Sequence, residues 1–183
     1  MRVNRKLRVP VLVTVCVALA PAEGFAQPQR AEPREGYVLA RAAATYRRVW
    51  DIPVYALEAE LGLGWGTEEV RRAFGAQFLH GRTQAGLPAW GVDFVFQHEW
   101  GIGDALWCGF SAELGTLWFN RATGDGSVAG GGIGGALRLG YDFVRGDGIR
   151  LGPEIAFDAM EYVSNTSVLV WGPTVGFRLR TRM

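Results

Sequence analysis

The sequence predicts an all-β fold, an eight-stranded antiparallel transmembrane β-barrel. The first indication is an alternation of large apolar with small or polar residues, because a period of two is typical of strands. The second is the length of this pattern: residues 90–102 and 106–118 each alternate over 13 residues. Strands of soluble proteins usually have about 5–6 residues, whereas a tilted strand that crosses a bilayer needs about 9–11.

The longest alternating stretch, residues 89–119, predicts a hairpin with a definite register. Gly103-Asp104-Ala105 provides a three-residue loop that pairs Ile102 with Leu106. Every later pair then joins residues on the same face, as in Trp90 with Trp118, Phe94 with Leu114 and Gln97 with Ser111. One face is large and aromatic, and the other consists mainly of Gly, Ser and acidic residues.

The two faces indicate the environment of the sheet. In a membrane barrel the large face contacts lipid, and the small polar face fills a narrow interior. Tryptophans lie towards the ends of the large face, as in an aromatic girdle; they are Trp90, Trp118, Trp100 and Trp171. We therefore expect the large face to be lipid-facing.

The first 26 residues have the composition of an export signal. A basic start precedes the apolar run Val9 to Ala20, and Gly24-Phe25-Ala26 fits a small-x-small cleavage site. Cleavage after Ala26 would leave 157 of the 183 residues, enough for one domain. Residues 27–36 are polar with two prolines and are expected to form a flexible leader. The barrel is then expected over residues 37–183.

The charge of the exported part is nearly balanced. Loss of the signal removes four of the 19 basic residues and one of the 18 acidic residues, which leaves a net charge of −2. Without a basic excess or a basic stripe, nucleic acid is not expected as a partner. The one remaining cysteine, Cys108, belongs to the large face and is expected to act as a small apolar residue.

Alternation continues over most of the chain. We expect strands at 37–50, 54–65, 70–80, 89–102, 106–119, 132–144, 149–162 and 167–182. Residues 37–50 also fit an amphipathic helix, and Thr67-Glu68-Glu69 can start a short helix before the third strand. Without the first and third strands, the fold would be six strands plus an N-terminal helix. Residues 81–88 and 120–131 have the composition of loops.

A second hairpin brings opposite charges together on the small face. Pairing Phe143 with Ile149 across its turn sets the register. This register makes two direct ion pairs, Arg138 with Glu154 and Asp142 with Arg150, and places Gly135 beneath Phe157. A turn at Asp51-Ile52 would likewise place Thr45 opposite Glu58, with Arg47 diagonal to that acid. Glu58 and Glu113 complete the charge network expected in the interior.

Two prolines interrupt the expected strands. Pro153 and Pro173 fall in mid-strand, where a closed barrel offers no free edge to accommodate a missing N–H. Each follows a glycine, so we expect a local β-bulge at each.

The export signal, the length of the remaining chain and a final alternating strand resemble the small outer-membrane β-barrel proteins of the OmpA/OmpX-like class. The resemblance is one of pattern and covers most of the exported chain. It implies a bacterial outer-membrane location, both termini in the periplasm and contact with outer-membrane lipid. It also implies that the outer-membrane assembly machinery recognises the last strand. That strand usually ends in an aromatic residue, whereas this chain ends in Met183.

Residues that could carry catalysis are few. A lipid-A deacylase with this architecture would show a His-x-Ser motif, and neither His98-Glu99-Trp100 nor His80-Gly81-Arg82 matches it. His98 belongs to the outward series but Ser111 and Glu113 to the inward one, so no Ser-His-acid triad is expected. The glycine-rich run 130–135 precedes a strand, which excludes a phosphate loop. The sequence predicts no catalytic residue, cofactor or metal site.

Together these observations predict a non-enzymatic outer-membrane barrel with a structural or surface-binding role. Eight strands leave an interior just wide enough for side chains, and the loops near 81–88 and 120–131 would make the contacts. A lipid-modifying barrel enzyme and a soluble periplasmic ligand-binding barrel are the alternatives. The number of subunits is not predicted.

Overall fold

The structure, a computed structural model of the 183-residue chain, describes residues 35–49, 52–120, 127–146, 148–163 and 167–183. These residues belong to one compact unit, Pro33–Met183. The expected export signal, the first eight residues of the expected leader and Trp50 lie outside the described residues.

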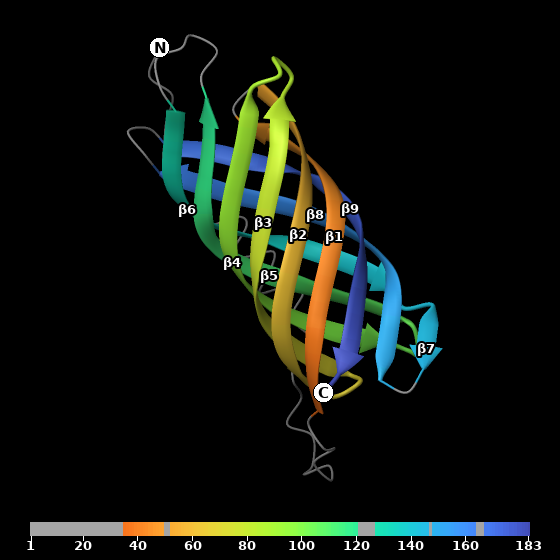
Figure 1. The fold of residues 1–183 in the computed structure, drawn as a ribbon. Coiled ribbons are helices and arrows are strands. Elements are labelled where there is room, and N and C mark those ends of the chain that lie inside the picture. Colours follow the sequence, from red (N-terminus) through yellow and green to blue (C-terminus); the bar gives the residue numbers. More distant parts are fainter. Residues whose placement is uncertain (1–34, 50–51, 121–126, 147, 164–166) are drawn as a thin grey trace. The chain divides into compact units, whose positions relative to one another are not determined.

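The described residues form nine strands and no helix (Figure 1). The strands are β1 (Glu35–Val49), β2 (Ile52–Gly66), β3 (Val70–Thr83), β4 (Pro88–Ile102), β5 (Leu106–Asn120), β6 (Ser127–Tyr141), β7 (Val144–Gly146), β8 (Ile149–Val163) and β9 (Ser167–Arg182). The three-residue β7 follows β6 after two residues and pairs with the same neighbour, β8. β6 and β7 therefore form one strand of an eight-stranded barrel.

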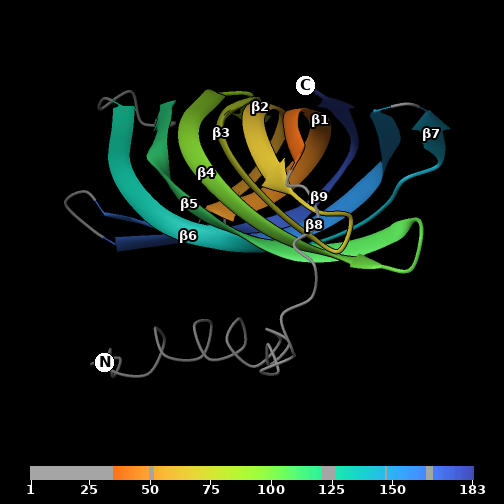
Figure 2. The same ribbon diagram turned by 90° about the horizontal axis from the view of Figure 1, so that it is seen from below.

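The barrel is antiparallel and closed. Apart from β6 and β7, which form one strand, strands that follow one another along the chain pair with each other. In addition, β1 pairs with β9 and β6 pairs with β8. Figure 2 shows the strands curving around a single interior. The amino-terminal end of β1 and the carboxy-terminal end of β9 lie at one end of the barrel, where Tyr37 pairs with Arg182. We call this the terminal end and the other the far end.

The register fixes the tilt of the strands. Pairs followed strand by strand lead from Leu39 through Gly62, Gly75, Val95, Glu113, Gly134, Met160 and Val170 to Val49. Val49 lies ten residues beyond Leu39 on β1. With about 3.3 Å per residue and about 4.8 Å between strands, this offset tilts the eight strands by about 40° from the barrel axis.

The eight-stranded prediction is confirmed, and the alternative of six strands plus a helix is wrong. Residues 35–49 form a strand along their whole length. Thr67 does not start a helix because it closes a turn between β2 and β3. Its backbone N–H donates to the Val70 carbonyl at 2.9 Å, and its hydroxyl accepts from the Val70 N–H at 3.2 Å.

Three expected loop segments are shorter than the sequence suggested. β1 begins at Glu35 within the expected leader, and β3 and β4 leave only residues 84–87 between them. β6 begins at Ser127, so the whole glycine-rich run 130–135 lies within this strand. Its glycines serve close packing here: a Cβ on Gly132 would lie 2.5 Å from the Tyr162 ring.

The register of the first hairpin is confirmed, but the other two are wrong. Trp90 pairs with Trp118, as predicted. In the second hairpin Arg138 lies opposite Ala156 and Glu154 lies opposite Gly140, a shift of two residues, and Gly135 lies opposite Ala159. On β1–β2 the residue opposite Glu58 is Ala43, again two residues from the prediction.

The shift in the second hairpin comes from a turn three residues tighter than predicted, since Gly146 and not Phe143 pairs with Ile149, and a β-bulge reduces it to two residues. Gly140 pairs with Glu154 before residues 142–143, and Val144 pairs with Leu151 after them, so three residues oppose two. The Phe143 N–H consequently donates to the Leu151 carbonyl at 3.0 Å, and Phe143 does not pair with Ile149. The bulge expected at Pro153 thus lies on the strand opposite it.

No bulge forms at Pro173, contrary to the prediction. β9 keeps one register with β8 through this proline and one register with β1 on either side of it. The pairing with β1 is interrupted only opposite Tyr46 and Arg47. Gly172 brings the two backbones close there, since a Cβ on it would lie 1.8 Å from the Tyr46 carbonyl oxygen.

The corrected register can be tested by cross-linking. In a Cys108→Ser background, Leu137→Cys with Phe157→Cys should form a disulfide on mild oxidation, because Leu137 and Phe157 are directly opposite and such Cα atoms lie about 4.5–5.5 Å apart. Leu137→Cys with Ile155→Cys is the matched control, since diagonal neighbours are about 7–8 Å apart. Mobility on a non-reducing gel would distinguish them, and preferential cross-linking of the control pair would contradict the register.

Candidate functional site

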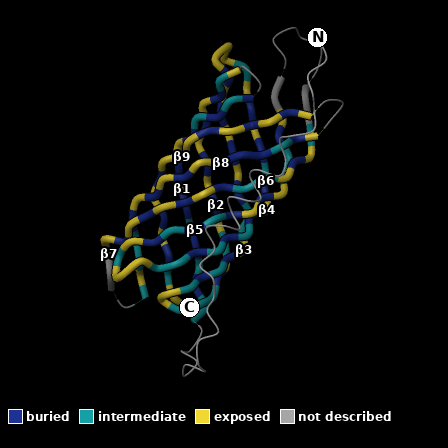
Figure 3. Tube along the Cα trace, turned by 180° about the vertical axis from the view of Figure 1, so that it is seen from behind, coloured by how far each residue is buried: buried dark blue, intermediate teal, exposed yellow. Residues whose placement is uncertain are grey.

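The outside of the barrel is apolar. Along each strand, buried residues alternate with more exposed ones (Figure 3), and the exposed series contains most of the large apolar side chains. Leu57, Phe94 and Ile133 are 68%, 70% and 69% exposed. A contiguous apolar surface of this extent is typical of contact with another apolar phase and not with water.

Aromatic side chains mark both edges of this surface. Trp90 and Trp100 both point outward and lie ten residues apart on β4. At about 3.3 Å per residue and a tilt of about 40°, they are separated by about 25 Å along the barrel axis, which matches the apolar band of a membrane barrel. Trp118, opposite Trp90, and Trp171 lie at the far end with it. The girdle itself stays a prediction, for which these positions are the ones required.

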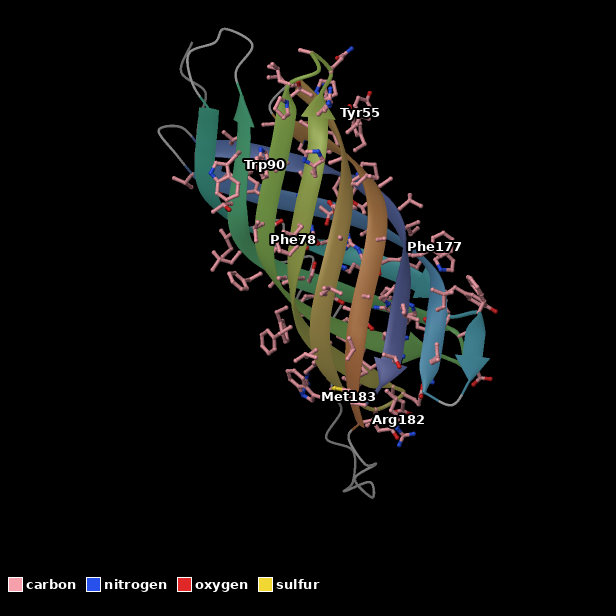
Figure 4. All side chains as sticks on the ribbon, viewed as in Figure 1. Tyr55, Phe78, Trp90, Phe177, Arg182 and Met183 are labelled. Atoms are coloured by element: carbon pink, nitrogen blue, oxygen red, sulfur yellow. The ribbon has the colours of Figure 1, made fainter. Side chains whose placement is uncertain are left out.

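Sequence reasoning missed part of the far-end aromatic set. Tyr55 is 58% exposed, and its ring lies 5.4 Å from that of Tyr46. Figure 4 shows Tyr55 and Trp90 towards the end opposite Met183 and Arg182, with Phe78 and Phe177 between the two ends. Tyrosine concentrates at membrane–water interfaces as tryptophan does, so Tyr55 extends the aromatic edge at this end.

The interior is charged at its centre, where Arg138 is the hub. This guanidinium lies 3.3 Å from Glu60, 3.3 Å from Glu113 and 3.2 Å from Glu154, and its Nε donates to Ser111 Oγ at 3.3 Å. All five side chains are buried. Arg138 reaches Glu154 diagonally, because an arginine side chain is long enough to span the two-residue shift.

A second arginine extends this central cluster. Arg41 pairs with Glu58, lies 3.4 Å from Glu60 and lies 3.7 Å from Glu154. Arg47 also pairs with Glu58, the contact that the sequence suggested. Sequence reasoning left Arg41 and Glu60 out of the network because the predicted register places Arg41 opposite Gly62, whereas it lies opposite Glu60. The contact of Arg41 with Glu154 joins β1 to β8 and depends on closure of the barrel.

A further charged cluster fills the terminal end. Asp142 pairs with Arg180 and lies 3.7 Å from Arg150, which also pairs with Glu68. Glu99 pairs with Arg178 and lies 3.5 Å from Arg71. The predicted contact between Asp142 and Arg150 is therefore present, although Arg145 is the residue opposite Arg150 in the ladder.

Trp107 packs within this terminal cluster. It is 1% exposed, and the Arg178 guanidinium lies 3.4 Å from its ring centroid, as in a cation–π contact. Its indole covers Gly140, where a Cβ would lie 2.1 Å from the ring. This tryptophan belongs to the inward series, so it is part of the filling and not of the girdle.

The far end of the interior is closed by apolar side chains. They form one buried cluster of Val49, Val54, Ala56, Leu79, Ala89, Leu117, Met160, Tyr162, Val168 and Val170. Asp93 lies beside it, within 3.5 Å of the Tyr162 hydroxyl. The interior thus passes from charged at the terminal end to apolar at the far end, and side chains fill both.

The residues considered for catalysis do not come together. The His98 ring stacks on Phe110 outside the barrel and accepts a hydrogen bond from Arg72 Nε at 3.2 Å. Ser111 points inside, where its hydroxyl donates to Glu113 at 2.7 Å. Histidine and serine are therefore on opposite faces of the sheet, which excludes the triad geometry for this pair.

Metal-binding groups and membrane-spanning helices are absent from the described part of the chain. Within it, no group of three or more His, Cys, Asp or Glu side chains has an arrangement that could hold a metal ion. In the same residues, no helix is long and apolar enough to cross a membrane.

Comparison with known proteins identifies the fold. No protein-family model matches the chain, and no curated protein matches its sequence. Among solved structures, it resembles the crystal structure of Neisserial surface protein A with a TM-score of 0.60 and 13% identity, over 83% of this chain and 100% of that one. The fold is that of a small outer-membrane β-barrel.

Two other outer-membrane proteins show weaker likeness. The N-terminal β-barrel domain of Pseudomonas aeruginosa OprF gives a TM-score of 0.42 at 15% identity, over 80% of this chain and 99% of that one. The outer membrane enzyme PagL gives 0.43 at 17% identity, over 75% and 97%. At these identities the comparisons concern the fold alone.

The Arg138 hub leads to a prediction on stability. Arg138→Ala leaves three buried carboxylates without their shared partner and should lower the free energy of unfolding by about 3–5 kcal/mol. Arg182→Ala is the control, because its pair with Glu35 is exposed and such pairs contribute about 0–1 kcal/mol. Denaturant unfolding of the folded barrel measures both; equal effects would contradict the hub.

A charge exchange separates a hub from a simple pair. Arg138→Glu combined with Glu154→Arg would restore stability if these two residues interacted only with each other. We expect no recovery, because a glutamate at position 138 would face Glu60 and Glu113. The same unfolding measurement on the double variant tests this, and recovery to near the parent stability would show that Glu154 is the dominant partner.

Proposed function

We propose that the protein is exported to a bacterial outer membrane, spans it as this barrel with both termini in the periplasm, and has a non-enzymatic structural or surface-binding role. One observation carries the proposal: an apolar outer surface about as tall as a bilayer core surrounds an interior filled by buried side chains. The likeness to solved outer-membrane barrels supports the same location.

The filled interior argues against a diffusion pore. Arg138 and Arg41 cross the centre to carboxylates on other strands, and the apolar cluster closes the far end. Opening a water-filled path would separate ion pairs that are buried within the barrel, which is strongly unfavourable. We therefore expect the barrel to act as a structural component of the membrane or to bind partners at its surface, and not to conduct solutes.

The faces argue against the two alternatives. A soluble ligand-binding barrel would turn its large apolar residues inward, whereas here they point outward. A lipid-modifying enzyme needs a nucleophile or base on the lipid-facing side or rim. The described histidines on that side, His98 and His80, stack on Phe110 and lie edge-on to Trp90, respectively, and Ser111 points to the other face of the sheet.

A surface-binding role would use the rim of the far end. The expected contact loops are short or outside the described residues: residues 84–87 join β3 and β4, and 121–126 are not described. Only residues 50–51 lie between β1 and β2. At these two turns, contacts would therefore come mainly from the ends of the strands.

Location is the first test of this proposal. The exported chain should sediment with outer membranes, need detergent for extraction and migrate differently on a gel before and after boiling, because its outer surface is apolar. In planar bilayers it should show no stable open-pore conductance; a porin of about 16 strands, which encloses an aqueous channel, is the positive control. Recovery as a soluble periplasmic monomer would overturn the proposal.

The last strand provides a second test, because we propose that the assembly machinery recognises it. Deleting Phe177–Met183 should abolish insertion: β1 residues from Tyr37 to Ala42 and β8 residues from Ile149 to Pro153 would lose their β9 partners, and unpaired backbone is not tolerated in lipid. Met183→Phe, which restores the usual terminal aromatic, should insert at least as well as the parent. Heat-modifiable mobility of membrane fractions measures both, and normal insertion of the truncated chain would contradict this role of β9.

A further inference from the structure

A strip of polar and aromatic side chains lines the outer surface at the far end. It consists of Tyr46, Arg48, Tyr55, His80, Arg82 and Trp90, which we call the far-end strip. These residues belong to the outward series of four consecutive strands, β1 to β4. Each of them lies within three residues of the far end of its strand, at the level that Figure 4 shows for Tyr55 and Trp90.

Pairing across the strands makes the strip continuous. Arg82 lies directly opposite Tyr55, and Tyr55 directly opposite Tyr46. On the other side, the His80 ring lies edge-on to Trp90 at 6.4 Å. Both Arg82 and His80 are exposed, so their polar groups face outward beyond the sheet.

The charge of the two ends differs. Among the described residues of the far end, the outward charged groups are Arg48, Arg82 and Glu161. Glu161 lies on β8, two strands from β1, and is hydrogen-bonded to Ser167. The described residues of the terminal end include outward or exposed side chains of both signs: the acids Glu35, Glu68, Glu69 and Asp104, and the arginines Arg72, Arg150 and Arg182. The far-end strip is therefore cationic on an otherwise aromatic and apolar edge.

The residues next to the strip are apolar and exposed. Leu57 lies directly opposite His80 and is 68% exposed, and Phe78 on the same strand as His80 is 55% exposed. A ligand held by Arg82 would therefore have hydrocarbon surface immediately below it. That combination fits a lipid, whose acyl chains lie against Leu57 and Phe78 while its headgroup reaches the arginine.

Arginine and tyrosine favour a phosphate headgroup. A guanidinium donates two parallel hydrogen bonds to phosphate oxygens, and tyrosine and tryptophan concentrate at the headgroup level of membranes. Cations at a membrane surface are attracted by anionic lipids. We propose that the far-end strip binds the phosphate groups of a phosphorylated lipid in the leaflet around the far end. This inference rests on the membrane location proposed above.

Two lipids that differ only in phosphate test the inference. The folded exported chain in neutral detergent micelles would be titrated with bisphosphorylated lipid A and with its dephosphorylated form, and bound lipid measured by native mass spectrometry. We expect the bisphosphorylated lipid to bind about tenfold more tightly, as one charge-assisted pair of hydrogen bonds provides. Equal binding of the two lipids would overturn the inference.

The chain offers a matched control on one strand. Arg72 and Arg82 both point outward from β3, ten residues apart, at opposite ends of the barrel. Arg82→Gln should remove most of the preference for phosphate, and Arg72→Gln should leave it intact. Equal loss in both variants would mean that net charge, and not the strip, is responsible, and it would overturn the inference.

Further readouts separate the possible failures. Inorganic phosphate at millimolar concentration should not displace the lipid, because it lacks acyl chains; displacement would overturn the assignment to a lipid. Each variant must keep its heat-modifiable folded form and its membrane insertion. A barrel that inserts but does not distinguish the two lipids would exclude this inference alone, whereas a barrel that does not insert would exclude the proposed location as well.

Discussion

The buried arginine–carboxylate contacts are the interaction on which the rest of this structure depends. Eight strands enclose a space that admits little more than one layer of side chains, so inward charges are held away from bulk water. Such charges are tolerated only when partners surround them. Arg138 and Arg41 meet this condition by reaching carboxylates on several strands, which ties together walls that share no backbone hydrogen bonds.

Glycines make room for this filling. Tyr162 lies over Gly132, Trp107 lies over Gly140, and the Asp93 carboxylate lies where a Cβ on Gly115 would be. In each case a large or charged side chain occupies the space that a side chain on the glycine would take. An interior lined by many glycines is therefore still filled. A glycine-rich inner face is therefore compatible with a sealed barrel.

The alternation predicted the strands and their faces because the period of two is a property of each strand alone. Registers were harder: the Trp90 hairpin has a simple three-residue loop, but the second hairpin turns between Gly146 and Ile149, later than predicted, and also contains a bulge at residues 142–143. Alternation alone reveals neither feature. The contact between Arg138 and Glu154 was nevertheless foreseen, because an arginine side chain spans a two-residue error. Contacts across the interior, such as that of Arg41 with Glu154, depend on closure and could not be derived from single hairpins.

The short connections at the far end determine what can reach this protein. Only residues 50–51 separate β1 from β2, and residues 84–87 separate β3 from β4. If the barrel spans an outer membrane as proposed, these two connections would lie close to the headgroups and below any long sugar chains carried by neighbouring lipids. Large molecules that approach from outside, such as antibodies and phages, would then meet these sugar chains first. The neighbouring lipids of the same leaflet would have free access to the barrel at these two connections.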